Sequence, residues 1–227
     1  MQNESELDRL AKENAQLRGD LLTVATRVSH DLRTPLGGIL SAAEALREIA
    51  EETSATQTLT DSLIVSAEEL SKMIKSVSFV LKATANPQPK EPLKMEGVFA
   101  FALQRLEHRI VKNRASIQQP ESWPQISGVA EWLETIWSTL LEFALKRGGS
   151  PKIEVGWREG EGEKIFWLRD NVAIPPDQHS ELFQPFDSLH KLNSCGSLNF
   201  ATARRLAELQ GGRCGCDGNS LFFTLPN

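Results

Sequence analysis

The stretch VSHDLRTPL, residues 28–36, decides how the first part of this chain folds and what it presents to solvent. Val28, Leu32 and Leu36 recur at helical spacing, which places them on one face of an α-helix. His30 lies about two residues off that apolar stripe. We therefore expect a helix that turns the stripe inward and holds the imidazole of His30 in solvent.

An exposed histidine in this setting is suited to phosphoryl transfer, because it titrates near neutrality and its neutral ring nitrogen is a competent nucleophile. Asp31 can orient the ring by accepting its other proton, which leaves the attacking nitrogen with a free lone pair. Thr34 follows one turn later on the same face, placed to hold a water or a phosphate oxygen, and Pro35 is expected to kink the helix there. A single helical histidine is nevertheless most often an ordinary surface residue, so the whole stretch has to carry the interpretation.

Heptad patterns extend outward from this stretch on both sides. In each of two segments the mainly apolar positions alternate spacings of three and four residues: Leu7, Leu10, Asn14, Leu17, Leu21, Val24 and Val28 in the first, and Leu59, Leu63, Ser66, Leu70, Met73, Val77 and Val80 in the second. The intervening EETSATQT, residues 51–58, has turn chemistry. These patterns predict an antiparallel helical hairpin that pairs with a second copy into a dimeric four-helix bundle. A coiled-coil spacer without chemistry is the alternative that periodicity alone leaves open.

Beyond the hairpin, NPQPKEP at residues 86–92 reads as a stiff linker, and the pattern then changes. Apolar periodicity predicts helices over 94–113, 129–147 and 199–210. Segments that alternate or run apolar predict strands over 153–157, 165–168 and 220–225. Helices interspersed with hairpin-connected strands are typical of an α/β two-layer sandwich.

Composition excludes several classes of function. A net charge of −5 argues against a nucleic-acid binder. The acidic, polar N-terminus is unlike a signal peptide, and no apolar run is long enough for membrane insertion, so we expect a cytoplasmic protein. Of the three cysteines, Cys214 and Cys216 lack partners at zinc-ligand spacing, so no metal site is expected and reduced thiols are the better interpretation.

The string SHDLRTPL, residues 29–36, resembles the phosphoacceptor box of histidine kinases almost letter for letter. The resemblance implies a dimerisation and phosphotransfer hairpin over 1–85, a linker over 86–92 and a histidine-kinase-type ATP-binding domain over 93–227. In that family the boxed histidine, here His30, is autophosphorylated from ATP and passes phosphate to an aspartate on the receiver domain of a response regulator. Asp31 and Thr34 match the family's acid/base and phosphatase positions, and Arg33 is a candidate partner contact.

The nucleotide-binding motifs of the family are altered in this chain. Thr139 and Phe143 stand at the two asparagine-box positions, and phenylalanine cannot ligate the magnesium that accompanies ATP. Asp170, at the position that reads the adenine amino group, is retained, although a loop cap would explain it equally well. Val172 and Ala173 replace the glycines that follow, which obstructs close approach of the backbone to a nucleotide.

Further along the chain, Leu182–Phe186 is a good match to the family's phenylalanine box. The last glycine box is degenerate: Gly196 is out of phase, and Asn199 could retain some anion binding at a helix start. The degenerate nucleotide site is thus expected to comprise Asp170, Asn171, Gly196 and Asn199.

Three functions follow from these observations. The chain can be a dimeric phosphorelay protein in which His30 exchanges phosphate with a receiver domain. In that case its ATP site is lost or weakened, and an upstream kinase can be the phosphate donor. The short segment before the box, with no sensor domain, favours this hypothesis. It can instead be an active cytoplasmic kinase that uses ATP and magnesium through a divergent pocket, or a non-catalytic regulator that binds a kinase or response regulator.

Overall fold

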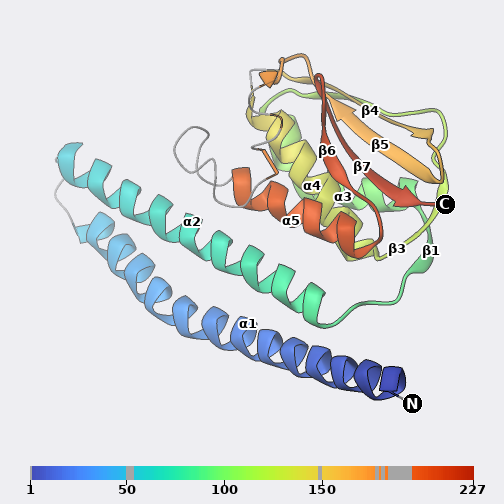
Figure 1. The fold of residues 1–227 in the computed structure, drawn as a ribbon. Helices are drawn as coiled ribbons and strands as arrows, with labels where there is room; N and C mark the ends of the chain where they lie inside the picture. The colour runs from blue at the N-terminus through green and yellow to red at the C-terminus, as the bar shows by residue number, and fades with distance from the viewer. Residues whose placement is uncertain (1, 50–53, 148–149, 177–178, 180–181, 184–195) are drawn as a thin grey trace. The chain divides into compact units, whose positions relative to one another are not determined.

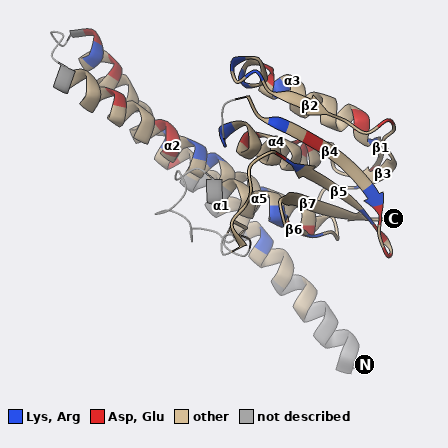
Figure 2. Ribbon diagram, turned by 90° about the horizontal axis from the view of Figure 1, so that it is seen from above, with Lys and Arg blue, Asp and Glu red and all other residues tan. Residues whose placement is uncertain are grey.

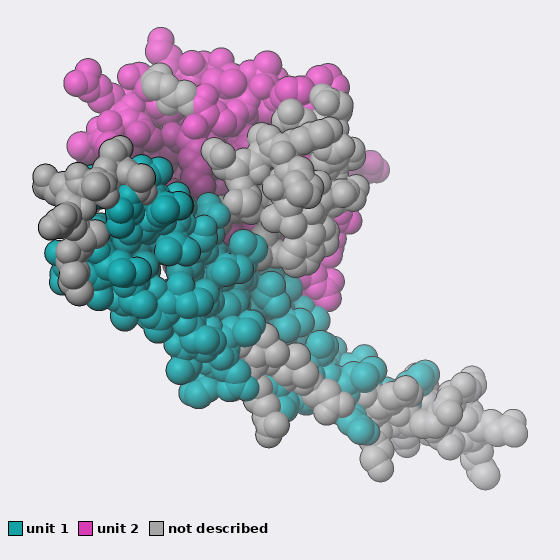
Figure 3. Space-filling model, turned by 90° about the vertical axis from the view of Figure 1, so that its left-hand side faces the viewer, with its two compact units in different colours: residues 1–87 teal, residues 88–227 magenta. Residues whose placement is uncertain are grey.

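The structure, a computed structural model, describes residues 2–49, 54–147, 150–176, 179, 182–183 and 196–227. The chain divides into two compact units, residues 1–87 and 88–227, coloured separately in Figure 3. Within the described residues, no helix combines the length and the apolar character that crossing a bilayer requires.

The first unit is a helical hairpin of α1 (Gln2–Ile49) and α2 (Ser54–Ala85) (Figure 1). Helix α1 continues through Pro35. The turn expected over 51–58 is too long, because α2 already begins at Ser54. Hydroxyl side chains are accommodated there by bonding to the helix backbone: Thr60 Oγ1 donates to the carbonyl of Thr56 at 2.8 Å.

Small side chains separate the two helices of the hairpin. Ala25, Ala43 and Ala67 are buried, and Ser78 Oγ donates to the carbonyl of Ala25 at 3.2 Å. The large apolar side chains instead lie at the surface of the single chain at heptad spacing, with 36–54% of each exposed: Leu32, Ile39 and Leu46 on α1, and Leu63, Leu70 and Val77 on α2. We call these six residues the apolar stripes. The contact between α1 and α2 therefore leaves about half of each of these side chains exposed.

The second unit is a sheet with helices on one face (Figure 1), which confirms the α/β two-layer prediction. The sheet has the order β2-β4-β5-β7-β6, in which β2 pairs with β4 in parallel and the remaining neighbours are antiparallel. Its strands are β2 (Ser116–Gln118), β4 (Lys152–Glu159), β5 (Glu163–Arg169), β6 (Cys214–Asp217) and β7 (Ser220–Pro226). The helices are α3 (Met95–Lys112), α4 (Ala130–Lys146) and α5 (Gly196–Leu209).

A second, smaller sheet begins inside the segment that the sequence assigns to the linker. Strand β1 (Glu91–Lys94) pairs antiparallel with β3 (Gln125–Gly128). Lys90 Nζ also donates to the carbonyl of Gln210, so this end of the predicted linker belongs to the second unit.

Aromatic side chains form the centre of the second unit. Trp137 of α4 is fully buried and meets the rings of Phe99 and Phe223 edge-on, at centroid distances of 4.9 and 5.1 Å. Its indole N–H donates to Met95 Sδ at 3.2 Å. Trp137 thus contacts both the helical layer and the sheet.

We expect Trp137→Ala to destabilise the protein by about 3–5 kcal/mol, because the substitution leaves a cavity among side chains that cannot close around it. Urea denaturation followed by circular dichroism measures this loss. Phe101→Ala is the matched control, since Phe101 lies on α3 with 61% of its side chain exposed. A loss below about 1 kcal/mol for Trp137→Ala would contradict this account of the core.

Candidate functional site

His30 projects into solvent from the middle of α1, with 81% of its side chain exposed. The preceding residue, Ser29, is buried, and because successive helical residues are rotated by about 100°, the imidazole points away from that buried side. Nδ1 of His30 lies 3.1 Å from Oδ1 of Asp31. A carboxylate at this distance favours the tautomer with a proton on Nδ1 and leaves the lone pair of Nε2 free to attack.

Thr34 lies one turn beyond the histidine and is exposed. Its Oγ1 donates to the carbonyl of His30 at 3.4 Å, a long hydrogen bond that holds the hydroxyl only weakly. This hydroxyl can therefore turn to donate a hydrogen bond to a phosphoryl oxygen near the imidazole, or accept one from a water.

A cavity of about 280 Å³ lies in the hairpin, beginning one turn beyond His30. Its apolar floor includes Leu36, Leu40 and Ala67, and its charged rim consists of Arg33, Glu68, Lys72 and Lys75. Both signs of charge occur along α2 (Figure 2), but on this rim the basic groups predominate. Sequence reasoning singled out Arg33 but missed Lys72 and Lys75, whose spacing of three residues on α2 was the available signal.

In the second unit, Asp170 follows β5 directly, and only 2% of its side chain is exposed. Oδ1 accepts a hydrogen bond from the backbone N–H of Val172 at 2.9 Å, so the residue does cap its own loop. Oδ2 is buried without a hydrogen bond and lies 3.6 Å from Nη1 of Arg147.

Arg147, which sequence reasoning did not select, follows the last residue of α4. Its Nη2 donates to the carbonyls of Val172 and Ala173 at 2.5 and 2.7 Å. Its guanidinium carbon lies 4.8 Å from the centre of the Phe143 ring. The arginine thus reaches back from α4 into the loop that begins at Asp170.

The two asparagine-box positions have no free oxygen ligand turned outward. The Phe143 ring meets the Phe200 ring edge-on at 5.0 Å, and Phe200 in turn meets Phe183 at 5.0 Å. Thr139 directs its hydroxyl to the carbonyl of Thr135 at 2.9 Å. Because magnesium requires oxygen ligands, these residues do not fit a magnesium–nucleotide complex of the usual kind.

The other predicted nucleotide-site residues lie on two elements, the loop after β5 and helix α5. Asn171 Oδ1 accepts a hydrogen bond from the backbone N–H of Lys152 at 3.0 Å, which ties the loop to the start of β4. Gly196 is the first residue of α5, and Asn199 is half-buried on that helix. The phenylalanine-box residues Leu182 and Phe183 are buried, while residues 184–186 lie outside the described part of the chain.

The two cysteines that the structure describes, Cys214 and Cys216, are half-buried free thiols on β6. Burial raises the pKa of Cys216 to about 11 and also raises the pKa of Cys214. Both thiols therefore carry their protons near neutral pH. Cys195 lies outside the described residues.

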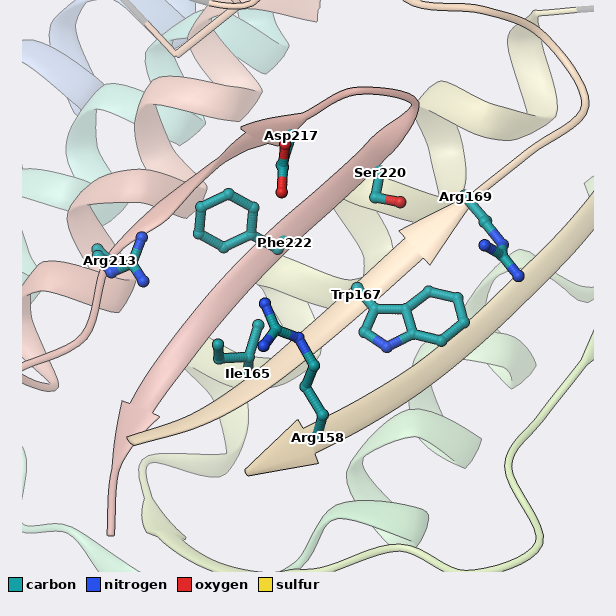
Figure 4. A pocket seen from close by; sticks show the side chains of 8 residues that line it. All are labelled: Arg158, Ile165, Trp167, Arg169, Arg213, Asp217, Ser220 and Phe222. Atoms are coloured by element: carbon teal, nitrogen blue, oxygen red, sulfur yellow. The ribbon is translucent and has the colours of Figure 1, made fainter. Parts of the chain in front are cut away.

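The face of the sheet turned away from the helices carries a shallow cavity of about 260 Å³ (Figure 4). Two of its arginines are neutralised by acidic neighbours: Arg169 bonds to Glu154 and Arg213 to Glu163, each at 2.6 Å. The hydrogen bond from Arg213 lowers the pKa of Glu163.

The same two arginines also cover aromatic rings of this cavity. The guanidinium carbon of Arg169 lies 5.1 Å from the centre of the Trp167 ring, and that of Arg213 lies 5.2 Å from the centre of the Phe222 ring. Sequence reasoning did not anticipate this cavity, and its charges and rings are largely engaged with one another.

Comparison with known proteins agrees with this arrangement. Residues 20–85 match the His Kinase A (phospho-acceptor) domain. Among curated relatives, the methanogenesis regulatory histidine kinase FilI of Methanothrix harundinacea is 26% identical over 88% of this chain and 24% of its own length. The sensor protein KdpD of Escherichia coli is 29% identical over 90% of this chain and 23% of its own length. The chain thus spans about a quarter of the length of these relatives.

Solved structures share the fold of both units. Full-length ShkA, crystallised with AMPPNP, has a TM-score of 0.65 at 21% identity over 89% of this chain and 45% of its own. The histidine kinase AdeS of Acinetobacter baumannii has a TM-score of 0.57 at 16% identity over 86% of this chain and 95% of its own. Residues 20–85, which carry the exposed His30, thus match the phosphoacceptor domain of histidine kinases, and most of the chain is similar to two-component sensor histidine kinases.

Proposed function

We propose that this protein is a phosphorelay component in which His30 carries phosphate to or from an aspartate of a response-regulator receiver domain, without using ATP efficiently. The observation that carries the proposal is the exposed imidazole, 81% accessible, with the Asp31 carboxylate 3.1 Å from its Nδ1. A nucleophile that must meet a phosphoryl group on another protein needs both accessibility and a defined tautomer.

In the proposed transfer, Nε2 of His30 attacks the phosphorus of an aspartyl phosphate on the receiver. The N–P bond forms as the bond between phosphorus and the carboxylate oxygen breaks, and the receiver aspartate leaves as a carboxylate. The proton stays on Nδ1, because the Asp31 carboxylate accepts its hydrogen bond. The same carboxylate offsets the positive charge that develops on the ring. Positioning supplies much of the remaining catalysis, with magnesium held by the receiver.

The docking surface for the receiver is the cavity beside His30. Its apolar floor and the basic groups of Arg33, Lys72 and Lys75 suit a receiver surface with an apolar ridge and acidic flanks. The proposed assembly is a homodimer, in which the apolar stripes of two hairpins cover one another in a four-helix bundle.

The proposed weakness of ATP use rests on the side chains at the nucleotide motifs. Phe143 packs against Phe200, and Arg147 faces Asp170, so the groups expected to hold magnesium and adenine are replaced or already engaged. Isothermal titration calorimetry of the full chain with ATP and magnesium is expected to show either no binding or a dissociation constant above about 1 mM. A dissociation constant in the micromolar range would overturn this part of the proposal.

An active kinase is the second candidate, favoured by the contact between His30 and Asp31, since a relay protein does not strictly need an acidic neighbour. Incubation with γ-labelled ATP separates the two candidates. Label that appears on the wild type and disappears in His30→Gln would establish the kinase.

A further inference from the structure

The loop after β5 and the end of α4 surround a single guanidinium group. Three kinds of contact converge on Arg147: the Asp170 carboxylate at 3.6 Å, the carbonyls of Val172 and Ala173, and the face of the Phe143 ring. Only 14% of the arginine side chain is exposed. A carboxylate, two carbonyl oxygens and an aromatic face together match the charge, the planar set of donors and the flat surface of a guanidinium.

We infer that residues 170–173 and Phe143 form a guanidinium-binding site, which the chain fills with its own Arg147. Arg147 acts there as an internal ligand that joins α4 to the loop after β5. The inference extends the proposed loss of ATP use, because Arg147 would hold the loop after β5 in place without a bound nucleotide. It is independent of phosphate transfer at His30.

The environment of Asp170 supports an internal ligand over an incidental surface ion pair. A surface pair of arginine and carboxylate contributes little to stability, whereas a carboxylate with 2% exposure is costly to leave without a counter-charge. Oδ1 is satisfied by Val172, but Oδ2 has no hydrogen bond and depends on the nearby guanidinium for compensation. Removing the cation therefore leaves a buried carboxylate beside a vacated, aromatic-walled space.

The loop is held at its other points by bonds that do not involve Arg147. Asn171 Oδ1 accepts from the backbone of Lys152, and Asn219 Oδ1 accepts from the backbone N–H of Ile174 at 3.2 Å. The two carbonyls that face the arginine should therefore keep their positions when it is truncated. This geometry gives an external guanidinium a preformed site.

The test uses the whole 227-residue chain and calorimetric melting. Arg147→Ala is expected to lower Tm by about 5–10 °C, and methylguanidinium at 1–20 mM is expected to restore part of that loss with saturation. Wild type, whose site is filled, should show no saturable rise. Methylammonium at equal ionic strength is the control for charge alone, and Arg147→Ala/Asp170→Asn should lose the response because the carboxylate is gone.

Arg147→Lys keeps the test decisive if the alanine variant fails to fold. It preserves the charge but lacks the planar donors, so a lowered Tm is expected even though the cation is conserved. An unchanged Tm in Arg147→Lys, or an equal response to methylguanidinium in wild type and Arg147→Ala, would overturn the inference. Micromolar ATP binding by the wild type would instead overturn the proposed loss of ATP use, and it is measured separately.

Discussion

Replacing His30 by glutamine is expected to abolish phosphate carriage, lowering phosphorylation of the protein by at least about 100-fold. Glutamine has an amide at a similar distance from the backbone, but its nitrogen lone pair is delocalised and does not attack phosphorus. His30 and its neighbour Asp31 are exposed, so the substitution should leave the fold and its stability unchanged. A loss of phosphate therefore reports chemistry and not unfolding.

Phosphoramidate serves as the donor, because it phosphorylates histidine without a partner protein. Intact mass spectrometry measures the added phosphoryl group, and its acid lability identifies phosphohistidine. His108→Gln is the matched control, since His108 is also an exposed histidine on a helix, α3, but lies outside the proposed site. Equal labelling of wild type and His30→Gln would remove the basis of the proposed function.

The second large effect is expected at the apolar stripes. Leu63→Glu/Leu70→Glu should convert a dimer into a monomer, raising the dimer dissociation constant by at least about 1,000-fold. Full burial of a leucine contributes about 1.5–3 kcal/mol, so burying the exposed half of two leucines from each of two chains contributes about 3–6 kcal/mol to association. Both side chains are about half exposed in the single hairpin, at 49% and 47%, so their replacement should not disrupt the contact between α1 and α2.

Analytical ultracentrifugation between 1 and 100 µM measures the change. Val111→Glu is the control: Val111 is 70% exposed on α3, in the second unit, and its replacement should not alter the mass. A wild-type protein that is monomeric throughout this range would contradict the proposed four-helix bundle. Circular dichroism of the double variant should show the helix content of the wild type.

The local sequence pattern was sufficient to predict the helical hairpin and the exposure of His30. The position of His30 two residues off the stripe predicts an exposed side chain, and periodicity alone decides this because a helix rotates by a constant angle per residue. The strands over 153–157 and 165–168 were predicted from local pattern as well, the first from alternating apolar residues and the second from a continuous apolar run. They correspond to β4 and β5.

The short strands were not predicted from the sequence. Strands β1, β2, β3 and β6 have three or four residues each, too few to show alternation. Each is defined by the neighbour with which it pairs, as β1 is by β3 and β6 by β7. The partners in the β1–β3 and β2–β4 pairs lie more than thirty residues apart, which leaves no local signal, whereas β6 pairs with the next strand but has only four residues.

The His30 segment and the Asp170–Arg147 site also differ in how far the sequence predicts them. His30, Asp31 and Thr34 lie within one helical turn or so, so sequence spacing alone determined their neighbourhood. Arg147 meets the Asp170 loop only because α4 and β5 pack together in the folded unit, and Asn171 bonds to the start of β4 for the same reason. Neighbours along a helix follow from its constant geometry, whereas contacts between a helix end and a loop more than twenty residues away were decided only by tertiary packing.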